Sequence, residues 1–463
     1  MTAVWDPSKP LPRREFARAL RMGLGRARID VRRHGLAGRE DLLVAACLRN
    51  PTRDTQVEGP LAQWLLAIAV EGRTLPAVRR AVVAAAVQPI ARRRDADQIA
   101  RILARLALGS DGGARRALLR MVDVQRPHDA FGAAQAIWAL GPAGLLRVAR
   151  SYGRRWRTAR HTDLGWLAWV TRDEIGVGRA TELLRTAASR NTTIRPFLAA
   201  IEAEFRDQRA PEPRPGIDAS LDALERYVAD GRRRAWTTWA RHASPRDREE
   251  AWRRLFTEPD VARLRRRLFT WGWRRGQRPP SLDPRLLTLA DHPDRRVRVG
   301  AVFLLDRFRD ERVRALALRR LRDDPKRASA EHVVGMLERN ARLADAAAIE
   351  RALPRGASRE TTHSWVMDAH RVAERRRGPA WDAMLLRCYE VSSCRSCRWM
   401  LLERLVERGL TSPSILREAR WDADDDVRRV AREALRKRQT AKTTRAPGAR
   451  AARTRAATSA VAP

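Results

Sequence analysis

Three of the four cysteines of this 463-residue chain lie within ten residues of one another, at Cys388, Cys394 and Cys397. Two histidines, His363 and His370, lie upstream of them. Thiolate and imidazole groups are ligands that Zn²⁺ prefers, so these five residues are the candidates for a metal site. Because the chain holds one Cys-x-x-Cys pair rather than two, the sequence by itself assigns no bound metal and no other cofactor.

The same cysteines allow two other interpretations. Ser392 and Ser393 are expected to cap a helix that begins at Cys394, and a helix N-terminus lowers the pKa of a thiol, which is typical of a redox cysteine. Cysteine is also a common small, buried residue on helices. A thioredoxin-like function would require a strand before the helix, and no strand is predicted here, so structural, metal-binding and redox roles all stay open.

A second candidate is the stretch 232–278, which interleaves arginine pairs with tryptophans. Arginine neutralises phosphates, and tryptophan offers a surface on which bases stack, so this segment predicts contacts to nucleic acid or to an acidic partner. The residues expected to make them are Arg232, Arg233, Arg234, Arg265, Arg266, Trp271, Trp273, Arg274 and Arg275. The alternative is a core role, because Trp252, Leu255 and Phe256 share a helical stripe. Trp271 and Trp273 are two apart and cannot both face one helix interface.

The chain has a formal net charge of +39, which is typical of proteins that bind nucleic acid or another polyanion. However, it contains 90 Arg and only 4 Lys, a skew that a GC-rich genome produces without selection for binding. None of the eight histidines lies in a His-Glu-x-x-His pattern, and no Gly-x-Ser-x-Gly segment or phosphate-binding loop is present. We therefore predict a protein without catalytic activity.

The elements that must position these residues are helices. Strand signals are scarce, whereas Ala, Leu and Arg, all strong helix formers, dominate the composition. The pattern Val-Arg-x-x-Ala-x-x-x-Leu occurs three times, beginning at Val297, Val313 and Val427. Its i, i+4, i+8 spacing places three apolar residues on one stripe, which a helix can bury only against neighbouring helices. The fold class is therefore all-α.

These repeats resemble the HEAT-repeat superfamily and are similar to uncharacterised bacterial members. The resemblance includes the aspartates of the turns that precede the first and last copies, at 291–294 and 422–426. Such an aspartate caps the second helix of a pair, and the repeat arginine is expected to pair with an acid of a neighbouring repeat. The resemblance implies a right-handed α-solenoid of about ten HEAT-like helical hairpins, a class that binds proteins or nucleic acid on a concave face.

One branch of this superfamily is enzymatic. Bacterial alkylpurine DNA glycosylases have a basic HEAT-like groove that is lined with Trp around a catalytic Asp. Their Trp-Trp-Asp-x-Val-Asp string is absent here, and the nearest pieces are Trp365-Val-Met-Asp368, Trp381-Asp382 and Asp163-x-x-Trp166-x-x-Trp169. A member of this branch must expose an Asp beside two Trp in a basic groove.

The chain is expected to divide at a proline-rich linker. The predicted order is a helical solenoid over 1–206, a linker over 207–216, a HEAT-repeat solenoid over 217–435 and a disordered basic tail over 436–463. Arg14–Arg33 is expected to form the first helix. No secretory signal and no stretch of about 20 apolar residues is present, so we expect a cytoplasmic monomer outside the membrane.

The function predicted from the sequence is a scaffold that binds a protein partner. A nucleic-acid-binding solenoid that uses the Arg/Trp segment is the alternative, and a glycosylase-like repair enzyme is the third. A nucleic-acid binder should lose affinity steeply with salt, because bound counterions are released.

Overall fold

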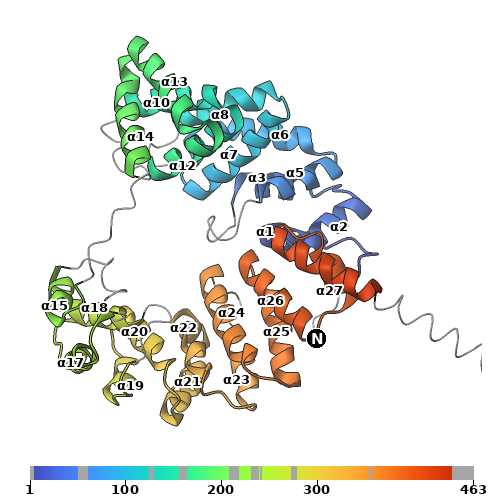
Figure 1. The fold of residues 1–463 in the computed structure, drawn as a ribbon. Helices are drawn as coiled ribbons and strands as arrows, with labels where there is room; N and C mark the ends of the chain where they lie inside the picture. Colours follow the sequence, from blue (N-terminus) through green and yellow to red (C-terminus); the bar gives the residue numbers. More distant parts are fainter. Residues whose placement is uncertain are drawn as a thin grey trace, which may run out of the picture. The chain divides into compact units, whose positions relative to one another are not determined.

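The computed structural model describes residues 5–50, 61–124, 130–155, 164–207, 218–230, 239, 242–272, 279–353, 356 and 358–440. Within these ranges every regular element is a helix, and none of those helices is long and apolar enough to cross a membrane. The chain forms two compact units, residues 1–212 with 412–463 and residues 213–411, and each has its own apolar core (Figure 1). The all-α prediction is confirmed for the described residues.

Unit 1 contains the helices of the first half of the chain and a segment from its end. They are α1 (Arg13–Met22), α2 (Gly25–His34), α3 (Glu40–Leu48), α5 (Ala62–Glu71), α6 (Leu75–Ala86), α7 (Arg93–Leu108), α8 (Gly112–Val124), α9 (Ala130–Leu140), α10 (Pro142–Arg154), α12 (Leu164–Ile175), α13 (Val177–Arg190), η1 (Thr192–Ile194), α14 (Arg195–Asp207), α27 (Pro413–Ala419) and a helix over 425–440. Helices α7, α9 and α12 contact in series, and α6, α8 and α10 do the same. Because α7 also contacts both α6 and α8, the array has two layers.

Unit 2 contains α15 (Leu221–Asp230), α17 (Pro245–Leu255), α18 (Val261–Gly272), α19 (Arg285–Leu289), α20 (Arg295–Leu305), α21 (Glu311–Asp323), α22 (Pro325–Ala330), η2 (Val333–Leu337), α23 (Asp345–Arg351), α24 (Arg359–Glu374), α25 (Pro379–Val391) and α26 (Arg395–Glu407). Helices α22, α24 and α26 contact in series, as do α21, α23 and α25.

The helices that carry the repeated Val-Arg pattern begin with aspartate caps, as predicted. Asp294 caps α20, and its side chain accepts hydrogen bonds from the amides of Arg296 (3.0 Å) and Val297 (3.1 Å). Asp310 caps α21 by accepting from the amide of Arg312 (2.8 Å), and Asp424 accepts from the amide of Val427 (3.1 Å) at the start of helix 425–440. The valine and alanine of all three copies are fully buried.

The predicted pairing of the repeat arginines with neighbouring acids is confirmed for two copies. Arg298 donates to Glu331 at 2.7 and 3.0 Å, and Arg314 donates to Asp345 at 2.6 and 2.7 Å. The third, Arg428, instead pairs with Asp425 of its own repeat.

The end of the described chain packs on its beginning, inside unit 1. Helix α27 contacts α2, and Glu418 accepts two hydrogen bonds from Arg26, at 2.7 and 2.9 Å. The amide of Ala423 donates to the carbonyl of Gly23 (2.9 Å), and the Trp64 indole donates to the carbonyl of Trp421 (2.9 Å). Residues 412–440 therefore belong to unit 1, whereas the sequence predicted a second solenoid that runs from 217 to 435.

Three further expectations from the sequence have different outcomes. The helix expected over Arg14–Arg33 is two helices, because Gly23 adopts a left-handed φ of 70° and ends α1. The linker predicted over 207–216 lies outside the described residues except for Asp207, the last residue of α14. The final helix continues to residue 440, past the predicted start of the tail at 436, and residues 441–463 lie outside the described part.

Candidate functional site

The Arg/Trp segment predicted as a binding surface is described only in part. Arg232, Arg233, Arg234, Trp273, Arg274 and Arg275 lie outside the described residues. The described ones are Arg265, Arg266 and Trp271, all on α18.

Trp271 lies in the core of unit 2. Its side chain is 2% exposed, and its ring packs edge-on against Trp252 (centroids 5.4 Å apart) and Trp239 (6.4 Å). A ring buried in this way has no free face on which a base could stack. Burial of Trp271 therefore favours the core role that the spacing of Trp252, Leu255 and Phe256 suggested.

The two described arginines of this segment are engaged within the protein. Arg265 forms an ion pair with Asp294, with Nε at 2.8 Å from the carboxylate. Arg266 donates to the carbonyls of Val228 and Ala229. Binding a phosphate would therefore require these guanidinium groups to give up existing partners.

A cavity of about 240 Å³ lies in unit 1, on the layer formed by α7, α9 and α12. Each helix contributes residues one turn apart, which share a helix face: Arg101 and Arg105 from α7, Gln135 and Trp138 from α9, and Trp166, Trp169 and Asp173 from α12. The volume is below that of sites for drug-sized ligands and leaves room for one small ring system.

The aromatic part of the cavity is partly open to solvent. The Trp166 and Trp169 rings are stacked, with centroids 4.9 Å apart and planes inclined by 21°. Trp169 is 41% exposed, although large hydrophobic side chains are usually covered. An exposed indole that is held flat by a second indole is a preformed stacking surface.

The two arginines of the cavity differ in their partners. Arg101 is neutralised by Asp97, which accepts from its Nε at 3.0 Å with both oxygens. The guanidinium of Arg105 lies over the Trp138 ring, 5.6 Å from its centroid, and no carboxylate among the described residues pairs with it. Burial, and to a lesser extent the charge of Arg101, lowers the pKa of Arg105. A bound anion would offset both the desolvation of the Arg105 guanidinium and its repulsion by Arg101.

The lining also contains two acidic residues. Asp173 and Glu174 are exposed, and within the described part of the chain neither forms an ion pair. Asp173 is one turn after Trp169 on α12, so its carboxylate and the indole share a helix face. The cavity thus combines an electron-rich aromatic wall and a carboxylate, which suit a cationic ring, with an arginine that suits a phosphate.

The sequence pattern pointed to Trp166 and Trp169 but not to Asp173. A Trp-Trp-Asp string places its aspartate next to the tryptophans, whereas the signal that identifies Asp173 is its i, i+4 spacing from Trp169. The other two pieces it compared contain tryptophans that are core residues, since Trp365 and Trp381 are 0 and 2% exposed. Asp163 lies outside the described residues.

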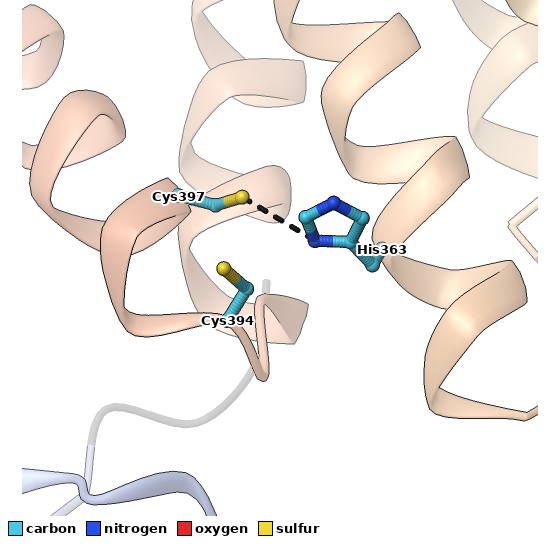
Figure 2. A group of neighbouring side chains, drawn as sticks. All are labelled: His363, Cys394 and Cys397. Atoms are coloured by element: carbon cyan, nitrogen blue, oxygen red, sulfur yellow. Dashed lines mark hydrogen bonds between the residues drawn. The ribbon is translucent and has the colours of Figure 1, made fainter. Parts of the chain in front are cut away.

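A separate cluster of thiols and one imidazole lies in unit 2. His363 of α24 faces Cys394 and Cys397 at the start of α26, as Figure 2 shows. One ligand atom from each of the three lies within 4.8 Å of the other two, and Cys397 Sγ is 3.4 Å from His363 Nδ1. The structure therefore brings together three of the five residues that were candidates for metal ligands from the sequence.

The remaining two candidates lie apart from this cluster. Cys388 is fully buried in α25, and burial raises the pKa of its thiol. His370 is buried in α24, and burial lowers the pKa of its imidazole. Met367, which was not a candidate from the sequence, also lies at the cluster, with its Sδ 3.3 Å from Cys397 Sγ. Its position one turn after His363 was the available signal.

The thiols differ in acidity according to their surroundings. A hydrogen bond with Cys397, supported by one with His363, lowers the pKa of Cys394 to about 4. Cys394 itself occupies the N-cap position of α26, so the prediction that Ser392 and Ser393 cap this helix is wrong. The pKa of Cys394 is thus lowered as the sequence suggested, but by its hydrogen bonds with Cys397 and His363 rather than by the helix N-terminus alone.

No family model, no curated protein and no solved structure matches this chain.

Proposed function

We propose that this protein binds nucleic acid and accepts one unstacked base in the cavity of unit 1. The observation that carries the proposal is the exposed, stacked Trp169 in a cavity that also holds Arg105, a half-buried arginine whose guanidinium has no carboxylate partner among the described residues. An aromatic surface beside a cation is how proteins hold single-stranded nucleic acid: the ring stacks on a base and the cation binds the backbone.

The arrangement of helices supports this role. The cavity lies on one layer of a two-layer helical array, as expected for a HEAT-like α-solenoid, and such arrays present ligand sites on one face. The positive net charge of the chain would add sequence-independent attraction to phosphates. The protein-binding scaffold that the sequence favoured stays a prediction.

Binding of labelled single strands and duplexes of 20–30 nucleotides to the full chain, measured across a salt series, tests the proposal. We expect binding that weakens steeply with salt. Trp169→Ala should weaken single-strand binding by about 1–3 kcal/mol, since one stacking contact is lost. Arg105→Gln should also weaken it, and Arg115→Gln, at an exposed arginine of α8, is the matched control. If the two cavity variants bind as tightly as the control, the base-accepting site is wrong. Weak binding by the wild type near 0.15 M salt would favour the protein scaffold.

A second candidate function, N-glycosidic hydrolysis, is favoured by Asp173. The cationic ring of an N-alkylated purine would stack on Trp169, and a carboxylate would stabilise the positive charge that develops on the sugar. The bond between the sugar carbon and the base nitrogen breaks, and its electron pair neutralises the departing base. Water then adds to the sugar carbon and releases a proton.

Release of free base from DNA that contains N7-methylguanine, followed by chromatography, tests this activity. Asp173→Asn should abolish base release while DNA affinity is retained, because the carboxylate is needed for the reaction and not for stacking. Glu174→Gln is the neighbouring control. Equal release by wild type and Asp173→Asn would exclude the mechanism.

A further inference from the structure

We infer that His363, Cys394 and Cys397 form a binding site for a thiophilic d¹⁰ metal ion, Zn²⁺ or Cu⁺, in unit 2. This site is separate from the cavity proposed for nucleic acid, which lies in unit 1. Its chemistry is that of two thiolates and one imidazole, the donors that such ions prefer.

The distances in the cluster match those between ligands of one tetrahedral ion. With bonds of about 2.3 Å to sulfur and about 2.0–2.1 Å to nitrogen, neighbouring ligand atoms are roughly 3.5–3.8 Å apart. The three ligand atoms here lie within 4.8 Å of one another, and the Cys397–His363 separation is 3.4 Å. An ion could therefore be bound after side-chain adjustments of less than about 1 Å, without movement of either helix.

The backbone around the cluster is held in place from both helices. Arg359, at the start of α24, donates to the side chain (3.1 Å) and the carbonyl (2.6 Å) of Ser393, immediately before Cys394. Arg398, fully buried one residue after Cys397, donates to the carbonyl of Ser392 (3.4 Å). These bonds fix the loop over 392–394 relative to α24, so the three ligands are held together before an ion binds.

A purely apolar role for the thiols does not account for the imidazole. Buried cysteines usually pack as small hydrophobic residues, as the fully buried Cys388 does. Cys394 and Cys397 are also buried, at 4 and 2% exposure, but a partly exposed imidazole points at them rather than into solvent (Figure 2). Two thiols and a ring nitrogen from two helices converge on one point, which is what a metal ion requires.

The ligand in the fourth coordination position distinguishes a Zn²⁺ site from a Cu⁺ site. Met367 Sδ lies 3.3 Å from Cys397 Sγ and is on the same face of α24 as His363. A thioether suits Cu⁺, whereas Zn²⁺ usually completes three protein ligands with water. The effect of Met367→Leu therefore reports which ion the site selects.

The test is titration of the reduced full chain with ZnCl₂, and separately with Cu⁺, in competition with a chromophoric chelator. We expect one ion per chain. His363→Gln, Cys394→Ser and Cys397→Ser should each weaken binding by more than about 100-fold, beyond the effect of losing a residue that only supports a ligand. Cys388→Ala is the matched control, since it removes a buried thiol of the same unit outside the cluster, and it should bind normally.

Circular dichroism of each variant separates ligand loss from misfolding, and His363→Gln keeps the test decisive because His363 is only partly buried. If Met367→Leu weakens Cu⁺ binding and leaves Zn²⁺ binding unchanged, the thioether is a ligand for Cu⁺. The proposal is overturned if the reduced wild type binds neither ion in a one-to-one ratio. It is also overturned if Cys388→Ala loses the ion as fully as the three cluster variants do.

Discussion

Glu331 offers the sharpest test of how the repeat arginines stabilise unit 2. Its carboxylate is 1% exposed and accepts from Arg298 at 2.7 and 3.0 Å, and from Arg320 and Arg327. Arg298 and Arg320 are themselves only 8 and 9% exposed. Glu331→Gln keeps the size of the side chain but removes the charge on which two buried guanidinium groups depend.

The expected cost follows from the partners that remain. Removing one member of a buried ion pair typically costs about 3–5 kcal/mol, because a charge is left buried without compensation. Arg298 would still donate to the carbonyls of His292 and Pro293, both at 2.7 Å, so the loss should fall near the lower end, about 3 kcal/mol. Asp323→Asn is the control. Its pair with Arg322 is 3.4 Å long between side chains that are 60 and 77% exposed, and such pairs contribute about 0–1 kcal/mol.

Hydrogen exchange followed by mass spectrometry measures this effect locally in the full chain. Peptides from α20 and α21 of Glu331→Gln should exchange roughly 100-fold faster than in the wild type, which corresponds to about 3 kcal/mol. Burial alone would raise the pKa of Glu331. Hydrogen bonds and charges from Arg298 and Arg320 outweigh this effect and lower the pKa in the folded state. The stabilisation is therefore present above the unfolded pKa of about 4.5 and is lost as the pH falls below it. A rate increase no larger than that of Asp323→Asn would refute the reasoning.

Two further predictions concern stability. Burial raises the pKa of Asp306 to about 7, against the lowering effect of Arg371 and Arg307 and with a smaller contribution from Glu338 and Asp368. The contribution of Asp306 to the stability of unit 2 should thus fall as the pH rises from about 4 to about 7, by at most roughly 1.4 kcal/mol per pH unit. In a pH series of urea unfolding, Asp306→Asn should lack this contribution to the slope. In Gly25→Ala the new Cβ would lie 2.0 Å from the backbone oxygen of Glu418, so we expect a loss of about 1–3 kcal/mol. Thermal unfolding should show a lower Tm for this variant and not for Gly178→Ala, where nothing lies within 4 Å.

Local patterns in the sequence predicted the local structure well. The aspartate caps, the buried Val and Ala positions and two arginine–acid pairs depend on residues within about one repeat, where spacing is informative. The break at Gly23 was missed because apolar spacing continues through it, and only the backbone conformation reveals the turn.

The candidate sites depend on contacts between segments far apart in the sequence. The cavity joins Arg101 to Asp173 through three helices, and no local pattern specifies that these faces meet. The Arg/Trp segment was a misleading signal for the opposite reason: Trp271 looked available from its spacing, but tertiary packing buries it. The thiol cluster was partly predictable, because Cys394 and Cys397 are only three residues apart in the sequence. The choice of His363 over His370 could not be predicted, because it depends on the orientation of α24.

The return of residues 412–440 to the start of the chain has a consequence for the order of folding. Unit 1 is discontinuous in sequence, and unit 2 is in effect an insertion within it. During synthesis the Trp64 indole has no partner until Trp421, 357 residues later, has been translated. All of unit 2 is made in that interval, so it can form its own core first. A chain that stops at residue 411 would leave that surface uncovered, whereas a circular permutant that joins 412–440 directly ahead of α1 would supply it from the outset.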